Sequence, residues 1–106
     1  ECIVDISKKF ESYATVDIGH AVVNGYEPIS FISNLLQNNV KIDCFHLHNN
    51  DGVKDLHYDL TAGIIDYKKI LDFVFSNQIF GHFVFEHWTN NLISKRYFED
   101  ILKSQK

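Results

Sequence analysis

Three residues of this sequence combine a metal-binding side chain with a place at or near the end of a β-prone run: Asp17, His46 and Glu86. Carboxylate oxygens and imidazole nitrogens are the ligands that hard and borderline divalent ions prefer. Charged groups brought together at strand ends are costly unless a cation compensates them. If the three runs are neighbouring strands, these residues predict one shared site for Mn, Zn, Mg or Co.

Each of these residues also has a simpler explanation. An Asp after a strand is commonly a turn residue or a helix cap, and a lone His on a strand is commonly a core residue with a satisfied ring. Glu86 could pair with a Lys or Arg. The coincidence of one such residue on each of three strands favours the metal site.

The β-prone runs 13–17, 42–48 and 82–86 alternate with helical patterns. Four helices are predicted: across 3–13, from Glu27-Pro28 to Asn38, after Asp66 as N-cap, and after Thr89, Asn90 or Asn91. The apolar faces of the second, third and fourth helices are, in that order, Ile29, Ile32, Leu35 and Leu36; Tyr67, Ile70, Leu71 and Val74; and Ile93, Tyr97, Phe98, Ile101 and Leu102. No hairpin signal separates the strands, so the order predicts right-handed βαβ crossovers and a parallel α/β sheet.

Alternation along each strand predicts an apolar outer face and an inner face with polar ends. The inner residues are Tyr13, Thr15 and Asp17, then Ile42, Cys44, His46 and His48, then His82, Val84 and Glu86. The C-terminal ends of parallel strands are where open sheets and barrels build their sites. Cys44 is interpreted as a core residue. His82 is assigned to the opposite end of the sheet and His87 to an outward, structural position.

Composition narrows the class of protein. The chain has 106 residues with a net charge of −4, which disfavours general nucleic-acid or membrane binding, and no apolar run approaches the roughly 20 residues of a membrane-spanning helix. Two distant cysteines and no secretory leader suggest a reduced, cytoplasmic setting. The chain contains no Met, so we expect it to be part of a longer protein or a processed product.

Several ordered motifs resemble the C-terminal half of the xylose isomerase-like TIM barrels, which include sugar (phosphate) isomerases and epimerases and endonuclease IV-type enzymes. The motifs are Val16-Asp17-Ile18-Gly19-His20-Ala21, Phe45-His46-Leu47-His48-Asn49-Asn50-Asp51-Gly52, Asp55-Leu56-His57, Gly63-Ile64-Ile65-Asp66-Tyr67 and Phe83-Val84-Phe85-Glu86. Two departures are Thr61-Ala62-Gly63 where Gly-x-Gly is frequent, and Asn49 where Asp is common.

The resemblance implies that residues 1–106 form the C-terminal part of one partial (β/α)8 barrel, with parallel strands six to eight and flanking helices. It implies Asp17, His46, Glu86 and His20 as metal ligands, with Glu86 also as the catalytic acid/base. His20, His48, Asp55 and His57 would line the substrate pocket. A further ligand Glu lies upstream in the family, and Glu1 does not match it.

The implied function is metal-dependent isomerisation or epimerisation of a small sugar or sugar phosphate by proton transfer next to a carbonyl. The alternatives are a zinc-dependent phosphodiesterase for abasic-site DNA, or a non-catalytic fragment. Lys54 is the only cation between His46 and Asp66, which disfavours DNA. A barrel needs about 250 residues, so we expect this chain alone to be inactive and to pair with the missing N-terminal half or with itself.

Overall fold

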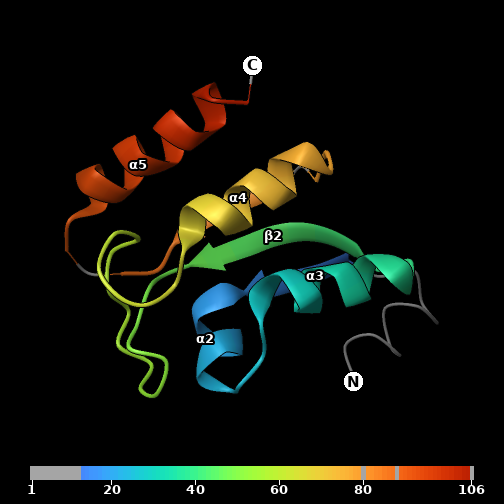
Figure 1. The fold of residues 1–106 in the computed structure, drawn as a ribbon, viewed down its shortest axis with the longest axis horizontal. Coiled ribbons are helices and arrows are strands. Elements are labelled where there is room, and N and C mark those ends of the chain that lie inside the picture. The colour runs from blue at the N-terminus through green and yellow to red at the C-terminus, as the bar shows by residue number, and fades with distance from the viewer. Residues whose placement is uncertain (1–12, 80, 88, 106) are drawn as a thin grey trace.

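The computed structural model describes residues 13–79, 81–87 and 89–105, in which three strands alternate with helices (Figure 1). The elements are β1 (Tyr13–Asp17), α2 (Ile18–Val23), α3 (Pro28–Gln37), β2 (Lys41–Leu47), α4 (Tyr67–Ser76), β3 (His82–Phe85) and α5 (Asn91–Lys103). The helix predicted across 3–13 falls largely on residues 1–12, which lie outside the described part. None of the helices in the described part is long and apolar enough to cross a bilayer.

The strands form one parallel sheet in the order β1-β2-β3, as predicted. Asp17 is level with His46, and His46 is level with Val84. Glu86 follows β3 directly, and its amide donates to the Leu47 carbonyl at 2.9 Å, so the ladder continues one step beyond the strand. This α/β arrangement is consistent with a segment of a TIM barrel.

Carboxylates cap α3 and α4, the two helices that the sequence predicts to begin at Glu27-Pro28 and after Asp66. Glu27 accepts hydrogen bonds from the amides of Ile29 and Ser30, with Pro28 in the first turn of α3. Asp66 accepts from the amide of Lys69 at the start of α4. These side chains satisfy amides that have no partner within the helix, and their charge suits the positive end of the helix dipole.

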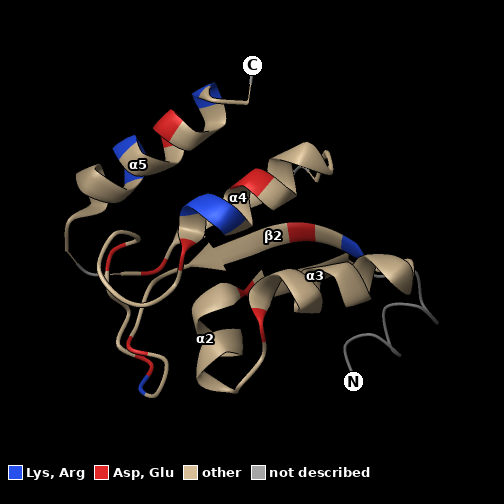
Figure 2. Ribbon diagram, in the orientation of Figure 1, with Lys and Arg blue, Asp and Glu red and all other residues tan. Residues whose placement is uncertain are grey.

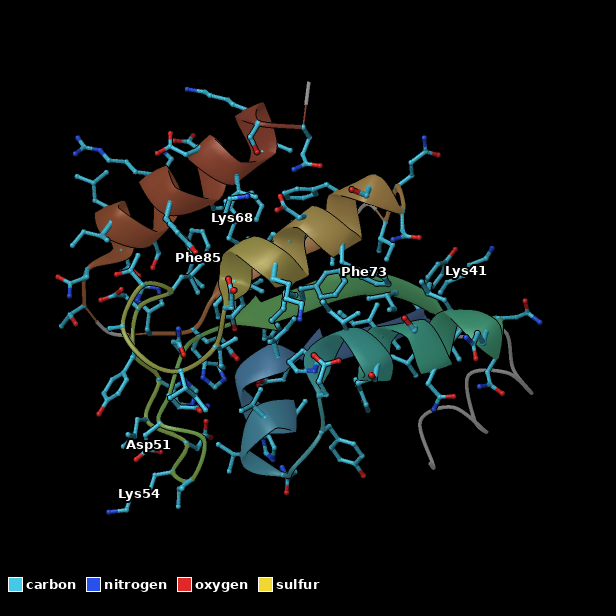
Figure 3. The ribbon with its side chains drawn as sticks, in the orientation of Figure 1. Lys41, Asp51, Lys54, Lys68, Phe73 and Phe85 are labelled. Atoms are coloured by element: carbon cyan, nitrogen blue, oxygen red, sulfur yellow. The ribbon has the colours of Figure 1, made fainter. Side chains whose placement is uncertain are left out.

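The core lies between the helices and one face of the sheet, and α3 and α4 both lie across β2 (Figure 1). Phe45 is fully buried and stacks on Phe83 with ring centroids 5.3 Å apart. Phe98 of α5 packs on Phe83 and on Phe75 of α4 at 5.0 and 5.7 Å. Figure 3 shows Phe85 on the same helix-covered side. In the described residues, no helix covers the other face of the sheet, where Val84 is 42% exposed.

The structure differs from the sequence prediction in the segment after Asp17 and in β2. The residues after Asp17, predicted as a loop, form the short helix α2. Ile42, predicted on the inner face, is buried on the same face as Phe45, because the register with β1 shifts by one residue between Ala14 and Thr15. Such an irregularity reverses the alternation on one side of it.

The other differences concern α5 and the residues before it. Ser94 is buried in place of Ile93 and Leu102, which are 48% and 46% exposed. Asn90 stands at the N-cap position, but its side chain makes no capping bond. His87, predicted to point outward, is buried, and its Nδ1 donates to the Thr89 carbonyl at 2.8 Å.

Asp59 connects the long loop between β2 and α4 to the start of α5. Its carboxylate accepts bonds from the amide and hydroxyl of Thr61 and from the side chain of Asn90 at 3.0 Å. Burial raises the pKa of Asp59, but the Thr61 and Asn90 hydrogen bonds outweigh it, so the pKa lies below the usual value.

We expect this pKa shift to make stability sensitive to acid. Because the folded pKa is depressed, the contribution of Asp59 is present above the unfolded pKa of about 3.9 and is lost as pH falls through the folded value. Asp59→Asn should lower the free energy of unfolding at pH 7 and flatten its decline below pH 4, as measured by urea unfolding at several pH values. An equal acid dependence in both proteins would contradict this role.

Candidate metal centre

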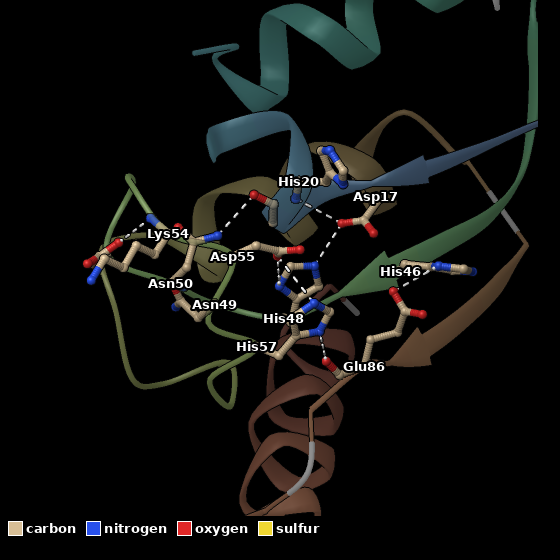
Figure 4. Close-up of polar contacts among 12 residues, drawn as sticks. Asp17, His20, His46, His48, Asn49, Asn50, Lys54, Asp55, His57 and Glu86 are labelled. Carbon is tan, nitrogen blue, oxygen red and sulfur yellow. Dashed lines mark hydrogen bonds and ion pairs between the residues drawn. The ribbon is translucent and has the colours of Figure 1, made fainter. Parts of the chain in front are cut away.

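The C-terminal end of the sheet gathers acidic and imidazole side chains from three strand ends and from the 49–66 loop (Figure 4). Ligand atoms of Asp17, His48 and Glu86 lie within 4.8 Å of one another, and so do those of His48, Asp55 and His57. Donor atoms bound to one ion at about 2.1 Å lie no more than about 4 Å apart. Small side-chain rotations would therefore bring either set into a common coordination sphere.

His48 belongs to both groups and is the most enclosed of these residues. It follows β2 directly and is fully buried. Its Nε2 lies 2.8 Å from Oδ1 of Asp17, while its Nδ1 lies 3.8 Å from Asp55 and has no hydrogen-bond partner among the described residues. A buried imidazole between two carboxylates, with one nitrogen unsatisfied, is chemically suited to a cation.

Asp17 both caps a helix and takes part in the site. Its Oδ1 accepts from the backbone amide of His20 at 2.9 Å, which begins α2, and from Nε2 of His48. Burial raises the pKa of Asp17, but these hydrogen bonds outweigh it, so the pKa lies below the usual value. The carboxylate therefore stays ionised and able to bind a cation at neutral pH.

Two histidines contact Glu86, one at its carboxylate and the other at its backbone carbonyl. His46 Nδ1 lies 2.9 Å from its Oε1, and His57 Nδ1 lies 2.6 Å from its backbone carbonyl. The side chains of His46 and Glu86 are 31% and 33% exposed, so this pair faces solvent on the uncovered side of the sheet. Glu86 thus keeps a carboxylate open for proton transfer or for an ion.

His57 packs against His48, with stacked rings 4.0 Å apart. Its Nδ1 donates to the Glu86 carbonyl, and its Nε2 faces Oδ1 of Asp55 at 3.2 Å. Burial alone would lower the pKa of His57, but these two acceptors outweigh it and raise the pKa. Its φ of 54° is uncommon for a side-chain-bearing residue, so the loop holds His57 in a costly conformation.

The register of the sheet decides which predicted residues meet. Leu47 is level with Phe85, which places His48 level with Glu86 and leaves His46 one layer lower. His46 therefore contacts Glu86 but belongs to neither three-residue group. The side chain of His20 belongs to neither group either, although its exposed ring lies beside Asp17 (Figure 4). The ligand roles of His46 and His20 stay predictions.

Asn49 holds the loop through four hydrogen bonds, a role that the sequence did not indicate. Its Nδ2 donates to the carbonyls of Leu60 and Ile65 at 2.9 and 3.0 Å, and its Oδ1 accepts from the amides of Asn50 and Ile65, both at 2.9 Å. An Asp could not make the two donated bonds, because an ionised carboxylate only accepts. Position 49 of this chain therefore needs an amide side chain to keep all four bonds.

Gly19 and Asn50 bring α2 against the loop. Asn50 Nδ2 donates to the Gly19 carbonyl at 2.9 Å. A Cβ on Gly19 would overlap the ring of His48, which His57 blocks on one face. The missing side chain at position 19 is therefore what lets His48 reach Asp17.

Loop 49–66 carries four acids and one cation, Lys54. Figure 2 shows acidic residues along this loop, and lysines on α4 and α5. Figure 3 shows Asp51 and Lys54 at its far end, away from the helices. The surroundings of the site are thus acidic, which attracts cations and disfavours a polyanion such as duplex DNA.

Comparison with known proteins finds one informative likeness. The structure is similar to the crystal structure of a D-tagatose 3-epimerase-like protein, with a TM-score of 0.75 and 27% sequence identity. The likeness covers 87% of this chain and 35% of that protein, so this chain spans about a third of its length. No protein-family profile matches the sequence, and no curated protein matches it.

Asn49→Asp should destabilise the protein by about 2–4 kcal/mol, because it replaces two donated bonds with a buried charge facing two carbonyls. Thermal or urea unfolding at pH 7 measures this. Asn34→Asp is the matched control, since it adds the same charge at an exposed position on α3. Equal effects of the two substitutions would contradict the role of the Asn49 amide.

Gly19→Ala should displace the His48 ring from Asp17, although Ala favours a helix over Gly by about 1 kcal/mol. We expect a change in the His48 imidazole ¹⁵N shifts together with a lower thermal midpoint. Unaltered His48 shifts with a raised midpoint would show that the added methyl group does not displace the ring, which would contradict this role of Gly19.

Proposed function

We propose that this chain is part of a divalent-metal-dependent sugar or sugar phosphate isomerase or epimerase, which moves a proton at the carbon next to a carbonyl. Residues 1–106 would form the C-terminal part of one xylose isomerase-like TIM barrel. The observation that carries the proposal is the convergence of Asp17, His48 and Glu86 within 4.8 Å at the C-terminal end of a parallel sheet. The likeness to a D-tagatose 3-epimerase-like protein supports the sugar substrate.

Asp17, His48 and Glu86 would hold the ion. Two carboxylates and one imidazole suit Mn²⁺, Co²⁺ or Zn²⁺, and accept Mg²⁺ less readily because of the nitrogen ligand. When bound, such an ion supplies Lewis-acid polarisation of the substrate carbonyl and the neighbouring hydroxyl, which acidifies the C–H bond between them. His48 is preferred here over His46 because of its place in the sheet register.

Glu86 would be the acid/base of this part of the site. Its carboxylate is one-third exposed on the uncovered face of the sheet, where a substrate can approach it. The hydrogen bond from His46 orients the carboxylate, which would both contact the ion and accept and return a proton. His20, Asp55 and His57 would contact substrate hydroxyls from the rim.

The charge around the site favours a sugar over DNA. A duplex needs several Lys or Arg residues on its phosphates, whereas loop 49–66 carries four acids and a single Lys. Because this chain spans about a third of the D-tagatose 3-epimerase-like protein, we propose that the rest of a barrel, or a second copy of the chain, covers the open face.

His48→Ala should weaken Mn²⁺ or Co²⁺ binding by more than 100-fold, because His48 lies level with Glu86. His46→Ala should weaken it less, by about 10–100-fold, because His46 only orients the Glu86 carboxylate. Isothermal titration or equilibrium dialysis measures the dissociation constants. His82→Ala, at the opposite end of the sheet, is the control. The reverse order would make His46 the ligand, and an undetectable ion in the unsubstituted chain would contradict the metal centre.

The reaction class has a direct test of its own. Ketohexoses incubated in D₂O with the Mn²⁺-loaded protein, expressed from the full reading frame that encodes this chain, should gain deuterium at the carbon next to the carbonyl. Glu86→Gln should abolish this exchange even at Mn²⁺ concentrations that saturate the variant. Cleavage of an abasic-site duplex without any sugar exchange would favour the phosphodiesterase instead.

A further inference from the structure

Tyr67 connects the first turn of α4 to His48, the residue that follows β2. Its ring is fully buried, and its hydroxyl makes two bonds to one residue: it donates to the His48 carbonyl at 2.6 Å and accepts from the His48 amide at 3.1 Å. The partners are 19 residues apart in sequence. One side chain thus satisfies both backbone groups of His48.

The backbone at His48 depends on this hydroxyl because, among the described residues, no other backbone group forms a hydrogen bond with the His48 amide or carbonyl. Strand β2 ends at Leu47, and the next residue, Asn49, pairs with Tyr58 in an isolated antiparallel bridge. His48 lies between these two pairings, and buried backbone groups without partners are costly. Burial, the main cause, raises the pKa of Tyr67 well above its usual value. The phenol therefore stays protonated and able to donate.

The contacts of the His48 ring show what this backbone position controls. From here the imidazole reaches Asp17 at 2.8 Å and stacks on His57 at 4.0 Å. A displacement of the His48 backbone would change both contacts, because the ring has only two rotatable bonds. The Tyr67 side chain itself is not exposed to solvent.

We propose that Tyr67 is a positioning residue for the metal centre, whose hydroxyl fixes the backbone of His48 and thereby aims its imidazole at Asp17 and Glu86. This inference rests on the proposed function for its chemical purpose, and on the two Tyr67 hydrogen bonds for its geometry. Side chains that orient a metal ligand without touching the ion commonly contribute 10–100-fold to metal affinity.

Tyr67→Phe tests the proposal, since it removes the hydroxyl and keeps the ring. Both proteins are titrated with Co²⁺ at a temperature below their thermal unfolding midpoints, and binding is followed by visible absorption. The dissociation constant of Tyr67→Phe should be 10–100-fold higher than that of the unsubstituted chain. Tyr58→Phe, which changes an exposed tyrosine of loop 49–66, should leave the dissociation constant unchanged. Equal Co²⁺ affinity in Tyr67→Phe and the unsubstituted chain would overturn the proposal.

A second readout separates this proposal from the proposed function. The ¹⁵N shifts of the metal-free His48 ring report its bond to Asp17, and they should change in Tyr67→Phe but not in Tyr58→Phe. If the unsubstituted chain binds no Co²⁺, the proposed function fails, and these shifts alone decide the role of Tyr67. Unchanged shifts would overturn it.

If Tyr67→Phe does not fold, hydrogen exchange in the unsubstituted chain gives the answer. The His48 amide should be as protected as the amides in the middle of α4, because its acceptor belongs to that helix. Exchange at the rate of the exposed loop amides near Lys54 would show that Tyr67 does not hold this backbone.

Discussion

The contact between His48 and Asp17 is the interaction on which the other features of the site depend. It joins the ends of two adjacent strands, and different elements hold its two residues in place. Asp17 is fixed by its bond to the first turn of α2, and His48 by the first turn of α4 and by the ring of His57. Because a parallel sheet brings all its C-terminal ends to one edge, the helices that follow the strands can clamp the residues at that edge.

Much of the fold could be predicted because hydrophobic periodicity and helix caps are local signals. The three parallel strands, the starts of α3 and α4 and the buried face of α4 are confirmed. Helix α2 was missed because Ile18-Gly19 directly after a strand is typical of a turn, and six residues give too little periodicity. The Asp17 cap and Gly25 beyond the helix end were the available signals.

The register shift between Ala14 and Thr15 could not have been predicted, since it depends on how two distant strands fit. It moved Ile42 to the helix-covered face. The structure places Asp17, His48 and Glu86 at the C-terminal edge of the sheet, where the sequence predicts a site, and the metal site itself stays a prediction. The choice between His46 and His48 requires knowing that Leu47 is level with Phe85. Asn49 and Tyr67 carry no metal-binding signature. The available signal at Tyr67 was its place on an apolar helix face, because a buried tyrosine hydroxyl usually needs a hydrogen-bond partner.

The two ends of the long loop between β2 and α4 are joined at one point, where Asn49 bonds to Ile65 and Tyr67 bonds to His48. The tip of the loop, where Asp51 accepts from the amides of Val53 and Lys54, lies outside that junction, and Val53 is exposed there. The tip is therefore a place where chain length and side-chain chemistry can vary at little structural expense. Selection, or a protein engineer, could reshape the rim there and alter which molecules enter without disturbing the groups beneath.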